Sequence, residues 1–334
     1  MSRDALNILV LHEQIGPDAR ADELDTLAQA EQVAAVLRQS GDQVVTMPAG
    51  LDLDTTLASI AKLGPDCVFN LVESLGGDGR MIHIVPALLS TAEIPFTGSS
   101  GEAIFLSSQK QLAKQWMRLN RISTPACLTE GAPGHDGIDR WIVKSRWEHA
   151  SFGMDDNCVV SGTAAAQARI ELCAGRHGGE WFAEQFVDGR EFNVSILEVD
   201  GQPRVLPIAE IGFVGFPPGK PKIVGYAAKW DVDAPEYHAT PREFPILNAG
   251  LSNALTQLAR KCWKSFGLRG YARVDFRLDA QGTPWVLEVN ANPCLSRDAG
   301  FAAAAHGADF TYEQLIGLIV EAALPGNAPA AQWN

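Results

Sequence analysis

Two carboxylates, an amide and a guanidinium occur close together near the end of the chain, at Arg273, Asp275, Glu288 and Asn290. Carboxylate and amide oxygens are the hard ligands that Mg²⁺ prefers, and an arginine beside them can bind phosphate oxygens. An ordinary Arg–Glu pair across two strands would explain the same residues, because such pairs are common on solvated sheet faces. The chain after Asn290 runs into an Asn/Pro turn, and strand ends of this kind are where binding sites tend to be built. We therefore treat the four residues as a candidate metal and phosphate site.

Two predicted strands must position these side chains. Apolar and polar residues alternate along residues 270–278, which predicts a strand with Arg273 on its polar face. Residues 284–290 predict a second strand, in which alternation puts Val286 on the same face as Glu288. A tight hairpin between the strands would place Arg273 opposite Glu288, since facing residues of an antiparallel pair share a face. The candidate side chains are therefore expected to converge.

The composition is that of an ordinary globular protein. The chain has 334 residues, too many for one comfortable core, so we expect two or three domains. A formal net charge of −13 argues against a nucleic-acid or anionic-membrane partner. The six cysteines include no C-x-x-C pair, so neither a zinc site nor a disulfide framework is expected. With no signal-peptide pattern and no apolar segment of membrane-spanning length, we expect a cytoplasmic protein.

The first part of the chain alternates predicted strands and helices. This pattern runs through residues 1–96 and predicts a parallel sheet, whose ligands would lie beyond the carboxyl ends of its strands. The loops at residues 12–17 and 70–80 fall at such ends, but neither matches the dinucleotide fingerprint, and no P-loop motif occurs. The glycines of the second loop can simply let the backbone turn; the sharper hypothesis is that Glu73 or Arg80 contacts a substrate.

Lysines and a loop of small residues follow in the middle of the chain. Residues 102–120 predict one long helix, on which Lys110 and Lys114 lie one turn apart, a spacing that usually marks a solvated face. Lys144 ends an apolar strand, where its charge either snorkels into solvent or serves a site. The loop at residues 148–154 has small residues and a glycine, so it could lie over phosphates and close as a lid.

Five segments stand in a characteristic order along the chain. They are Pro95–Gly98 with Lys110, Ile142–Lys144 with Ser151–Met154, Glu184–Glu191, Arg273–Asp275 and Glu288–Asn290. In order and spacing they resemble the D-alanine–D-alanine ligase-like ATP-grasp enzymes, over residues 69–324. The resemblance implies an α/β fold, α+β in the catalytic part, with a Rossmann-like parallel-sheet domain ahead of the ATP-grasp domains. The expected domains are the N-terminal domain (1–96), a central lid domain (97–187), a C-terminal catalytic domain (188–325) and a tail (326–334).

The resemblance implies how the nucleotide would be held. Lys110 and Lys144 would bind ATP phosphates, and Glu191 would accept hydrogen bonds from the ribose hydroxyls. The strand that pairs its backbone with the adenine edge would be Glu184, Gln185, Phe186 and Val187. ATP carries several negative charges, so several cations are needed to hold it. One pair of unit charges 4 Å apart is worth roughly 4 kcal/mol at an effective dielectric constant near 20.

The resemblance also implies the chemistry. The catalytic residues would be Arg273, Lys229 and Ser151. The metal ligands would be Asp275, Glu288 and Asn290, binding two Mg²⁺ ions, with Mn²⁺ as the alternative metal. In the implied reaction a carboxylate attacks the γ-phosphate to give an acylphosphate, and an amine then displaces phosphate. The protein would act mostly by positioning and charge stabilisation.

Several residues depart from the family pattern. The Gly-Gly-x-Ser-x-Glu stretch of those enzymes is replaced by residues 12–17, a lid serine by Ala150, and the tyrosine after the mobile-loop lysine by Trp230. We expect these changes to remove the hydrogen-bonded latch that closes over dipeptide. Cys294 replaces a glycine near the reacting carboxylate and would reshape the acceptor pocket. D-alanine–D-alanine ligase activity itself is therefore not expected.

Residues from three parts of the chain are expected to contact substrate. They are Glu73, Arg80, Tyr226, Trp230, Cys294, Ser296 and Arg297. Aromatic side chains in the two covering loops suggest a substrate bulkier than alanine, although they could equally pack the closed loops together. Ser296 could be an ordinary helix N-cap or, with Arg297, receive a substrate carboxylate.

Three functions fit these residues. The first is an ADP-forming carboxylate–amine ligase that joins an amino acid or a small biosynthetic intermediate to an amine. The second is an ATP-dependent small-molecule kinase or phosphotransferase. The third is a non-catalytic nucleotide-binding module, which the complete set of metal ligands disfavours. The expected partners are small-molecule acids and amines, with no nucleic acid and no membrane, and the architecture suggests a homodimer.

Overall fold

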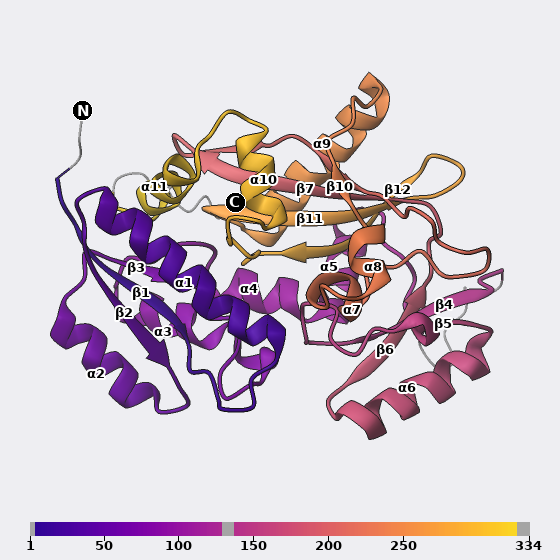
Figure 1. Cartoon of the computed structure of the whole chain (residues 1–334), viewed down its shortest axis with the longest axis horizontal. Coiled ribbons are helices and arrows are strands. Elements are labelled where there is room, and N and C mark those ends of the chain that lie inside the picture. The colour runs from indigo at the N-terminus through magenta and orange to yellow at the C-terminus, as the bar shows by residue number, and fades with distance from the viewer. Residues whose placement is uncertain (1–3, 129–136, 326–334) are drawn as a thin grey trace.

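Three β-sheets make up the framework of the protein. The computed structural model describes residues 4–128 and 137–325, so the predicted tail lies outside the described part. The first sheet holds β1–β3, the second β4–β6 and the third β7–β12. Figure 1 shows the first sheet at the left, the second at the lower right and the third running across the top of both. Within residues 4–128 and 137–325, no helix has the length and hydrophobicity that a membrane span requires.

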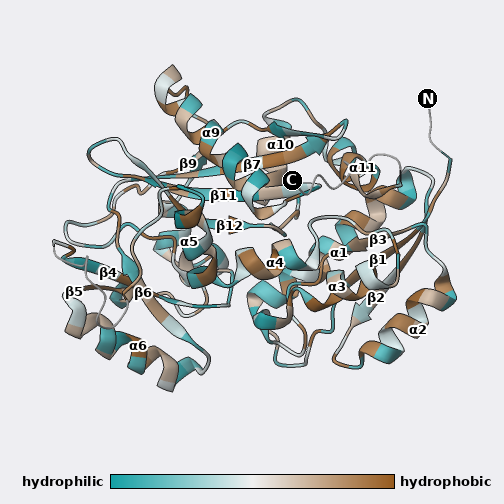
Figure 2. Cartoon of the chain, turned by 180° about the vertical axis from the view of Figure 1, so that it is seen from behind, coloured by the Kyte–Doolittle hydropathy of each residue, from teal (hydrophilic) through white to brown (hydrophobic). Residues whose placement is uncertain are grey.

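The first sheet is parallel, as the strand–helix alternation predicts. Its elements are β1 (Asn7–Glu13), α1 (Ala21–Gln39), β2 (Gln43–Ala49), α2 (Leu53–Leu63), β3 (Cys67–Asn70) and α3 (Ile84–Thr91), with strand order β2-β1-β3. Helices cover both faces: Ile8 and Val10 pack with α1, whereas Leu9 and Leu11 pack with α3. A strand covered on both faces is apolar along its length, and β1 and β3 are accordingly brown in Figure 2.

The second sheet is small and antiparallel. Its elements are β4 (Arg140–Ser145), β5 (Val159–Ser161), α6 (Thr163–His177) and β6 (Trp181–Gln185), with strand order β5-β4-β6. Trp141 and Val143 of β4 are fully buried against Ala166 and Cys173 of α6. Alternate residues of β4 therefore face the helix, and Ile142 and Lys144 face the other way, toward the rest of the molecule.

The third sheet provides the floor of the molecule's main cavity. Its strands are β7 (Arg190–Val199), β8 (Gln202–Val205), β9 (Ala209–Ile211), β10 (Arg242–Glu243), β11 (Tyr271–Leu278) and β12 (Pro284–Asn290), in the order β10-β9-β7-β11-β12 with β8 on β7. One face packs on α4 (Gly101–Ser108), α5 (Lys110–Leu119) and α9 (Ala249–Phe266) through Val274, Phe276 and Val286. The opposite face carries polar side chains, among them Arg273, Asp275 and Glu288, which line the cavity.

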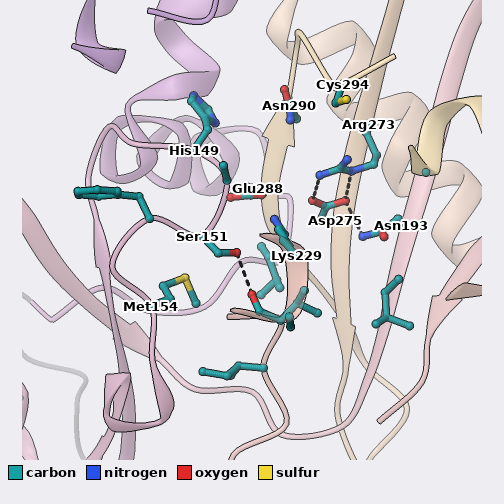
Figure 3. Close-up of a pocket in the computed structure, with 18 of the residues that line it drawn as sticks. His149, Ser151, Met154, Asn193, Lys229, Arg273, Asp275, Glu288, Asn290 and Cys294 are labelled. Atoms are coloured by element: carbon teal, nitrogen blue, oxygen red, sulfur yellow. Dashed lines mark hydrogen bonds and ion pairs between the residues drawn. The ribbon is translucent and has the colours of Figure 1, made fainter. Parts of the chain in front are cut away.

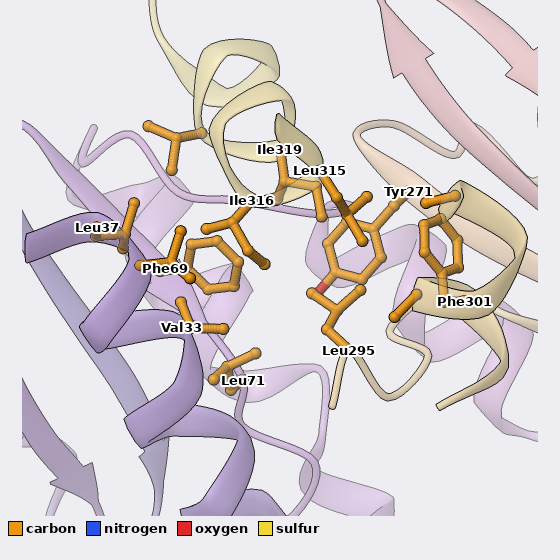
Figure 4. Close-up of a cluster of buried hydrophobic side chains, with 14 of the residues drawn as sticks. Val33, Leu37, Phe69, Leu71, Tyr271, Leu295, Phe301, Leu315, Ile316 and Ile319 are labelled. Atoms are coloured by element: carbon orange, nitrogen blue, oxygen red, sulfur yellow. The ribbon is translucent and has the colours of Figure 1, made fainter. Parts of the chain in front are cut away.

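The last helices of the chain complete the core of the first sheet. α10 (Gly300–His306) and α11 (Tyr312–Ala323) follow β12. Ile316 and Ile319 of α11 share a fully buried cluster with Val33 of α1 and Phe69 of β3, as Figure 4 shows. The predicted capping box of α11 is present, with Thr311 accepting from the backbone of Gln314 and Gln314 reaching back to it. The last helix is thereby packed against α1 and the first sheet.

The hairpin of β11 and β12 has a different register from the predicted one. Arg273 pairs with Asn290, and Asp275 pairs with Glu288. The prediction that Arg273 faces Glu288 is therefore wrong by two residues. Because side chains alternate with a period of two, a two-residue shift leaves all four polar side chains on one face.

A β-bulge on β12 accounts for one of the two residues, and a turn one residue longer than predicted, with Leu278 paired to Pro284, accounts for the other. The register shifts so that Phe276 pairs with Val286, which leaves Leu287 as an extra residue in the strand. Val286 consequently points into the core, with no exposed surface, while Glu288 stays on the polar face. The prediction that Val286 and Glu288 share a face is wrong for this reason.

The predicted long helix at residues 102–120 is two helices. α4 ends at Ser108 and α5 begins at Lys110, with Gln109 between them in an extended conformation, φ −77° and ψ 93°. The Gln109 side chain caps α5 by accepting from the backbone N–H of Leu112 at 2.5 Å. The break lets α5 turn so that both of its lysines face inward.

Candidate functional site

A cavity of about 510 Å³ lies where the three sheets meet. β4 and β6 form one wall, β11 and β12 form another, and the start of α1 closes one end. Two loops cover it, residues 148–154 and residues 223–230. In Figure 3 His149, Ser151 and Met154 of the first loop stand opposite Arg273 and Asp275, with Lys229 between the two groups.

Arg273 and Asp275 form a bidentate ion pair on the wall made by β11. Nε of Arg273 lies 2.8 Å from Oδ1 of Asp275, and Nη2 lies 2.9 Å from Oδ2. Nδ2 of Asn193, on the neighbouring β7, donates to the same Oδ1 at 2.8 Å. Asp275 is 6% exposed and the Arg273 side chain is 18% exposed, so the carboxylate is the more deeply buried member of the pair. The guanidinium and the carboxylate are thus fixed side by side at the cavity wall.

Glu288 and Asn290 continue this wall on β12. Both line the same cavity as Asp275. Burial opposes ionisation of Glu288, but the ammonium groups of Lys110, Lys144 and Lys229 outweigh it and lower the pKa of this carboxyl. Two carboxylates and an amide facing one space offer oxygen ligands to a divalent cation.

The protein alone supplies an incomplete shell for a metal at this wall. Within the described residues, no group of three or more His, Cys, Asp or Glu side chains is arranged to hold a metal ion. Mg²⁺ is commonly bound by only one or two carboxylates together with waters and substrate phosphates. The pair Asp275 and Glu288 therefore suits a cation that arrives with a nucleotide.

Three lysines from different elements direct their charge at the same space. Nζ of Lys110 donates to a backbone carbonyl of the lid loop at 2.6 Å, and burial together with Lys144 lowers the pKa of Lys110 to about 8. Lys144, on β4, lies 2.7 Å from Glu184. Lys229 lies on α7 (Tyr226–Trp230), and none of the described residues forms a hydrogen bond or ion pair with its side chain. Burial and the neighbouring Arg273 lower the pKa of Lys229, and this outweighs the opposing effect of Glu288, Asp275 and Glu191.

The end of the cavity bounded by β6 is apolar. Ile142, Phe186, Ile223 and Met154 form a small cluster there. The predicted adenine-strand residues all line the cavity, namely Glu184, Gln185, Phe186 and Val187. Glu191 lines it too, with its carboxylate 2.6 Å from Nη2 of Arg277. A flat apolar ring with a polar edge fits this end.

The two covering loops are bonded to each other. Oγ of Ser151 donates to the carbonyl of Val224 at 2.8 Å, a contact drawn in Figure 3. The indole N–H of Trp230 donates to the carbonyl of Ala150 at 3.1 Å. Ala150 and Ser151 both have positive φ angles, 58° and 60°, which are uncommon outside glycine and concentrate at functional sites. The two replaced positions of the expected latch, Ala150 and Trp230, are therefore joined through a backbone carbonyl.

The end of the cavity nearest α1 is acidic. Asp22, Asp25 and Glu73 line it. Burial raises the pKa of Glu73 to about 8, and the carboxylates of Glu13, Asp25 and Asp22 add to this effect. This end would stabilise a positively charged group.

Cys294 and Ser296 also lie at the acidic end. Sγ of Cys294 is 3.2 Å from Oδ2 of Asp25, and Oγ of Ser296 is 3.3 Å from both oxygens of the same carboxylate. Burial raises the pKa of Cys294, so its thiol is protonated and unsuited to nucleophilic attack. Ser296 is not a helix N-cap, because α10 begins at Gly300 with Ala299 at its N-cap.

Three of the predicted substrate residues do not line the cavity. Arg80 pairs with Asp78 at 2.5 Å on an exposed surface, and Arg297 pairs with Glu313 at 3.1 Å, also exposed. Tyr226 donates its phenol to a carboxylate of α1 at 3.0 Å, so it ties the covering loop to the first sheet's helix. Glu73, Trp230, Cys294 and Ser296 are the members of the predicted set that the structure brings together.

His149 is a further cavity residue. Its side chain lines the cavity, and its Nε2 is buried without a hydrogen-bond partner among the residues that the structure describes. Burial, with a contribution from Lys110, lowers the pKa of His149 to about 3, so the ring is neutral. A neutral imidazole can donate one hydrogen bond to an anion.

Sequence reasoning missed four residues that line the cavity or support it. Asp22 and Asp25 lie three residues apart near the start of α1, a spacing that puts both on one helix face and could have identified them. Asn193 follows Glu191 by two residues on β7, so alternation along the strand could also have found it. Lys114, 1% exposed, gave no signal, because its spacing from Lys110 is that of a solvated pair.

Several known proteins resemble this chain in sequence and in fold. Residues 141–321 match the family model described as D-ala D-ala ligase C-terminus. An uncharacterized protein of Sinorhizobium fredii, y4sG, is 30% identical over 88% of this chain and 87% of its own length. The D-alanine–D-alanine ligase of Bordetella pertussis is 29% identical over 91% of this chain and 95% of its own. The solved D-alanine–D-alanine ligase of Bacillus anthracis in complex with ATP has the same fold, with a TM-score of 0.73, 22% identity and coverage of 96% and 97%.

Proposed function

The chain belongs to the D-alanine–D-alanine ligase C-terminal domain family, and on that premise we propose that it is an ATP-dependent, ADP-forming carboxylate–amine ligase. Its fold is the ATP-grasp fold, with a parallel-sheet domain at its N-terminal end. The proposed reaction joins a small carboxylic acid to an amine through an amide bond.

One observation carries the proposal. Cationic side chains from α5, β4, α7 and β11 and the carboxylates of Asp275 and Glu288 line a single cavity. Lys229 forms no direct hydrogen bond or ion pair with the described side chains, which leaves its ammonium group available to a polyanionic ligand. A triphosphate with its divalent metal supplies the charges that this arrangement lacks.

The donor set suits ATP and a divalent metal. Lys110 and Lys144 would hold phosphates, and the apolar end beside Phe186 would take the adenine ring. Asp275 and Glu288, with Asn290, would bind Mg²⁺, and two ions are proposed from the family resemblance. The bound metal would neutralise charge on the phosphates.

The residues of this chain would then act by position and charge. Arg273 is held by Asp275 and would stay beside the transferred phosphoryl group, where charge builds up in the transition state. Lys229 would approach the same group from the covering loop. The contacts of Ser151 and Trp230 keep the loops closed, which excludes water from the acylphosphate formed on the acid substrate.

The amine substrate would enter at the acidic end. Asp22 and Asp25 would attract its positive charge and orient its nitrogen toward the acylphosphate, and the Glu73 carboxyl would add a hydrogen-bonding group beside them. Cys294 narrows this end where the family pattern has glycine. The acceptor is therefore proposed to differ from D-alanine.

The test is Mg²⁺-dependent ADP release across paired panels of acids and amines, with mass analysis of each active pair. We expect release that needs both partners and a product whose mass is that of the amide. Release with the acid alone, together with a stable phosphorylated product, would identify a phosphotransferase instead. No release with any pair, from protein that binds ATP normally, would contradict the ligase proposal.

A matched variant separates catalysis from mere binding. The double variant Asp275→Asn plus Glu288→Gln keeps side-chain shape and removes both carboxylate charges. We expect it to lose product formation, since the metal would lose its anionic ligands. Normal product formation by this variant would show that the two carboxylates play no part in the reaction.

A further inference from the structure

Lys114 is a buried charged residue that the proposed chemistry does not use. It is 1% exposed and does not line the cavity. Its Nζ lies 2.5 Å from Oε2 of Glu184, and it donates to Oγ1 of Thr124 and to the carbonyl of Leu287, each at 3.0 Å. Two of the three N–H donors of this ammonium group therefore have hydrogen-bond acceptors, and the ion pair with Glu184 adds a charged partner. The side chain is therefore held in one position.

Glu184 stands between Lys114 and Lys144. Oε2 of Glu184 contacts Lys114, and Oε1 contacts Lys144 at 2.7 Å. The side chains of Lys114 and Glu184 are each 1% exposed, and that of Lys144 is 14% exposed. Buried charges are tolerated only when paired, and here two cations share one anion. The three residues keep one net positive charge, and Lys144 presents it at the cavity.

We propose that Lys114 is a positioning residue that acts through Glu184 to keep Lys144 available to nucleotide phosphates. The inference rests on the proposed function, which assigns the phosphates to Lys144. Without Lys114, Glu184 would pair with Lys144 alone, and the charge facing the phosphates would be neutralised. Lys114 also holds the carbonyl of the bulge residue Leu287, next to Glu288, so it ties the nucleotide strand β6 to the metal-binding strand β12.

The test compares ligands with and without phosphates. Lys114→Met removes the charge and keeps most of the length of the side chain. Calorimetry then measures Kd and stoichiometry for a Mg²⁺-bound non-hydrolysable ATP analogue and for adenosine. We expect Kd for the analogue to rise about tenfold or more, and Kd for adenosine to stay within about twofold. An equal loss for adenosine, or a fall in stoichiometry with unchanged Kd, would overturn the inference, since either marks a purely structural role.

Two further variants keep the test decisive if Lys114→Met fails to fold. Thr124→Val removes a neutral partner of Lys114 and should leave both Kd values unchanged. The double variant Lys114→Met plus Glu184→Gln removes both charges and leaves Lys144 unpaired, so any loss of affinity should be similar for the analogue and for adenosine. A tenfold loss confined to the analogue would overturn the inference. If the wild-type protein binds neither ligand, the proposed function itself is refuted. This outcome is distinct from those that refute only the role of Lys114.

Discussion

Replacing Glu73 by glutamine should stabilise the protein, and the gain should grow with pH. Glu73 lies at the acidic end of the cavity, where Glu13 of β1 and Asp22 and Asp25 of α1 face it and Arg273 of β11 is the opposing cation. Burial, reinforced by these carboxylates, raises the pKa of Glu73 from 4.5 to about 8. The folded protein therefore disfavours the charged form that the unfolded chain adopts freely.

The sign and size follow from proton linkage. Because the folded pKa lies above the unfolded one, the folded state binds this proton more tightly. The stabilisation is complete below pH 4.5 and is lost as the pH rises through about 8. One pKa unit corresponds to about 1.4 kcal/mol, so ionisation of Glu73 costs the folded wild type about 4–5 kcal/mol at high pH. Glutamine does not titrate and avoids this cost.

Urea unfolding of wild type and Glu73→Gln at several pH values measures the effect. The difference in free energy of unfolding should increase from about pH 5 to about pH 9 and then level off. Glu31→Gln is the control, since the Glu31 side chain is 73% exposed on α1 and should give a small, constant difference. A difference for Glu73→Gln that does not change with pH, or that shrinks as pH rises, would refute the reasoning.

Three other variants probe the cavity. Asp275→Asn should lower ADP release about a hundredfold or more and raise the Mg²⁺ concentration for half-maximal release, because a proposed metal ligand and the charged partner of Arg273 are both lost. His149→Ala should raise Kd for a non-hydrolysable ATP analogue about tenfold and leave Kd for ADP unchanged, because the unpartnered Nε2 is expected to bind the terminal phosphate. Tyr226→Phe removes the 3.0 Å bond to α1 and should raise KM for the amine about three- to tenfold at saturating ATP.

Each of these variants has a matched control away from the cavity. Asp200→Asn changes an exposed carboxylate, and His306→Ala removes an exposed histidine at the end of α10. Tyr312→Phe removes a buried phenol oxygen that has no partner among the described residues. Unchanged Mg²⁺ dependence in Asp275→Asn, an equal loss of ADP affinity in His149→Ala, or an unchanged KM in Tyr226→Phe would contradict the corresponding assignment.

Strand periodicity explains what could be predicted about the site. Alternation in two segments is enough to place Arg273, Asp275, Glu288 and Asn290 on one face, because the period of two is set by the backbone itself. The parallel first sheet follows in the same way from alternating strands and helices. The register of the hairpin does not follow, since the bulge at Leu287 depends on contacts with α5, far away in sequence.

Local sequence does not reveal which charged side chains are buried in the folded protein. Lys110 and Lys114 have the spacing of a solvated pair, yet the break at Gln109 turns both inward. The buried charge of Lys114 on α5 is stabilised by Glu184, which lies on β6 of the second sheet and is distant in sequence. Arg80 shows the opposite case, because a loop that could reach a ligand instead pairs its arginine with the nearby Asp78.

The bulge also divides the pairing of β11 with β12 into two registers. Residues 273–275 and 288–290 keep a register that is anchored by β7 and by the ammonium group on Leu287. Residues 276–278 and 284–286 keep another, which ends in the turn at 279–283. Lengthening that turn would be absorbed before it reached the ion pair. The tip is therefore a suitable attachment point for a fluorescent reporter that leaves the cavity undisturbed.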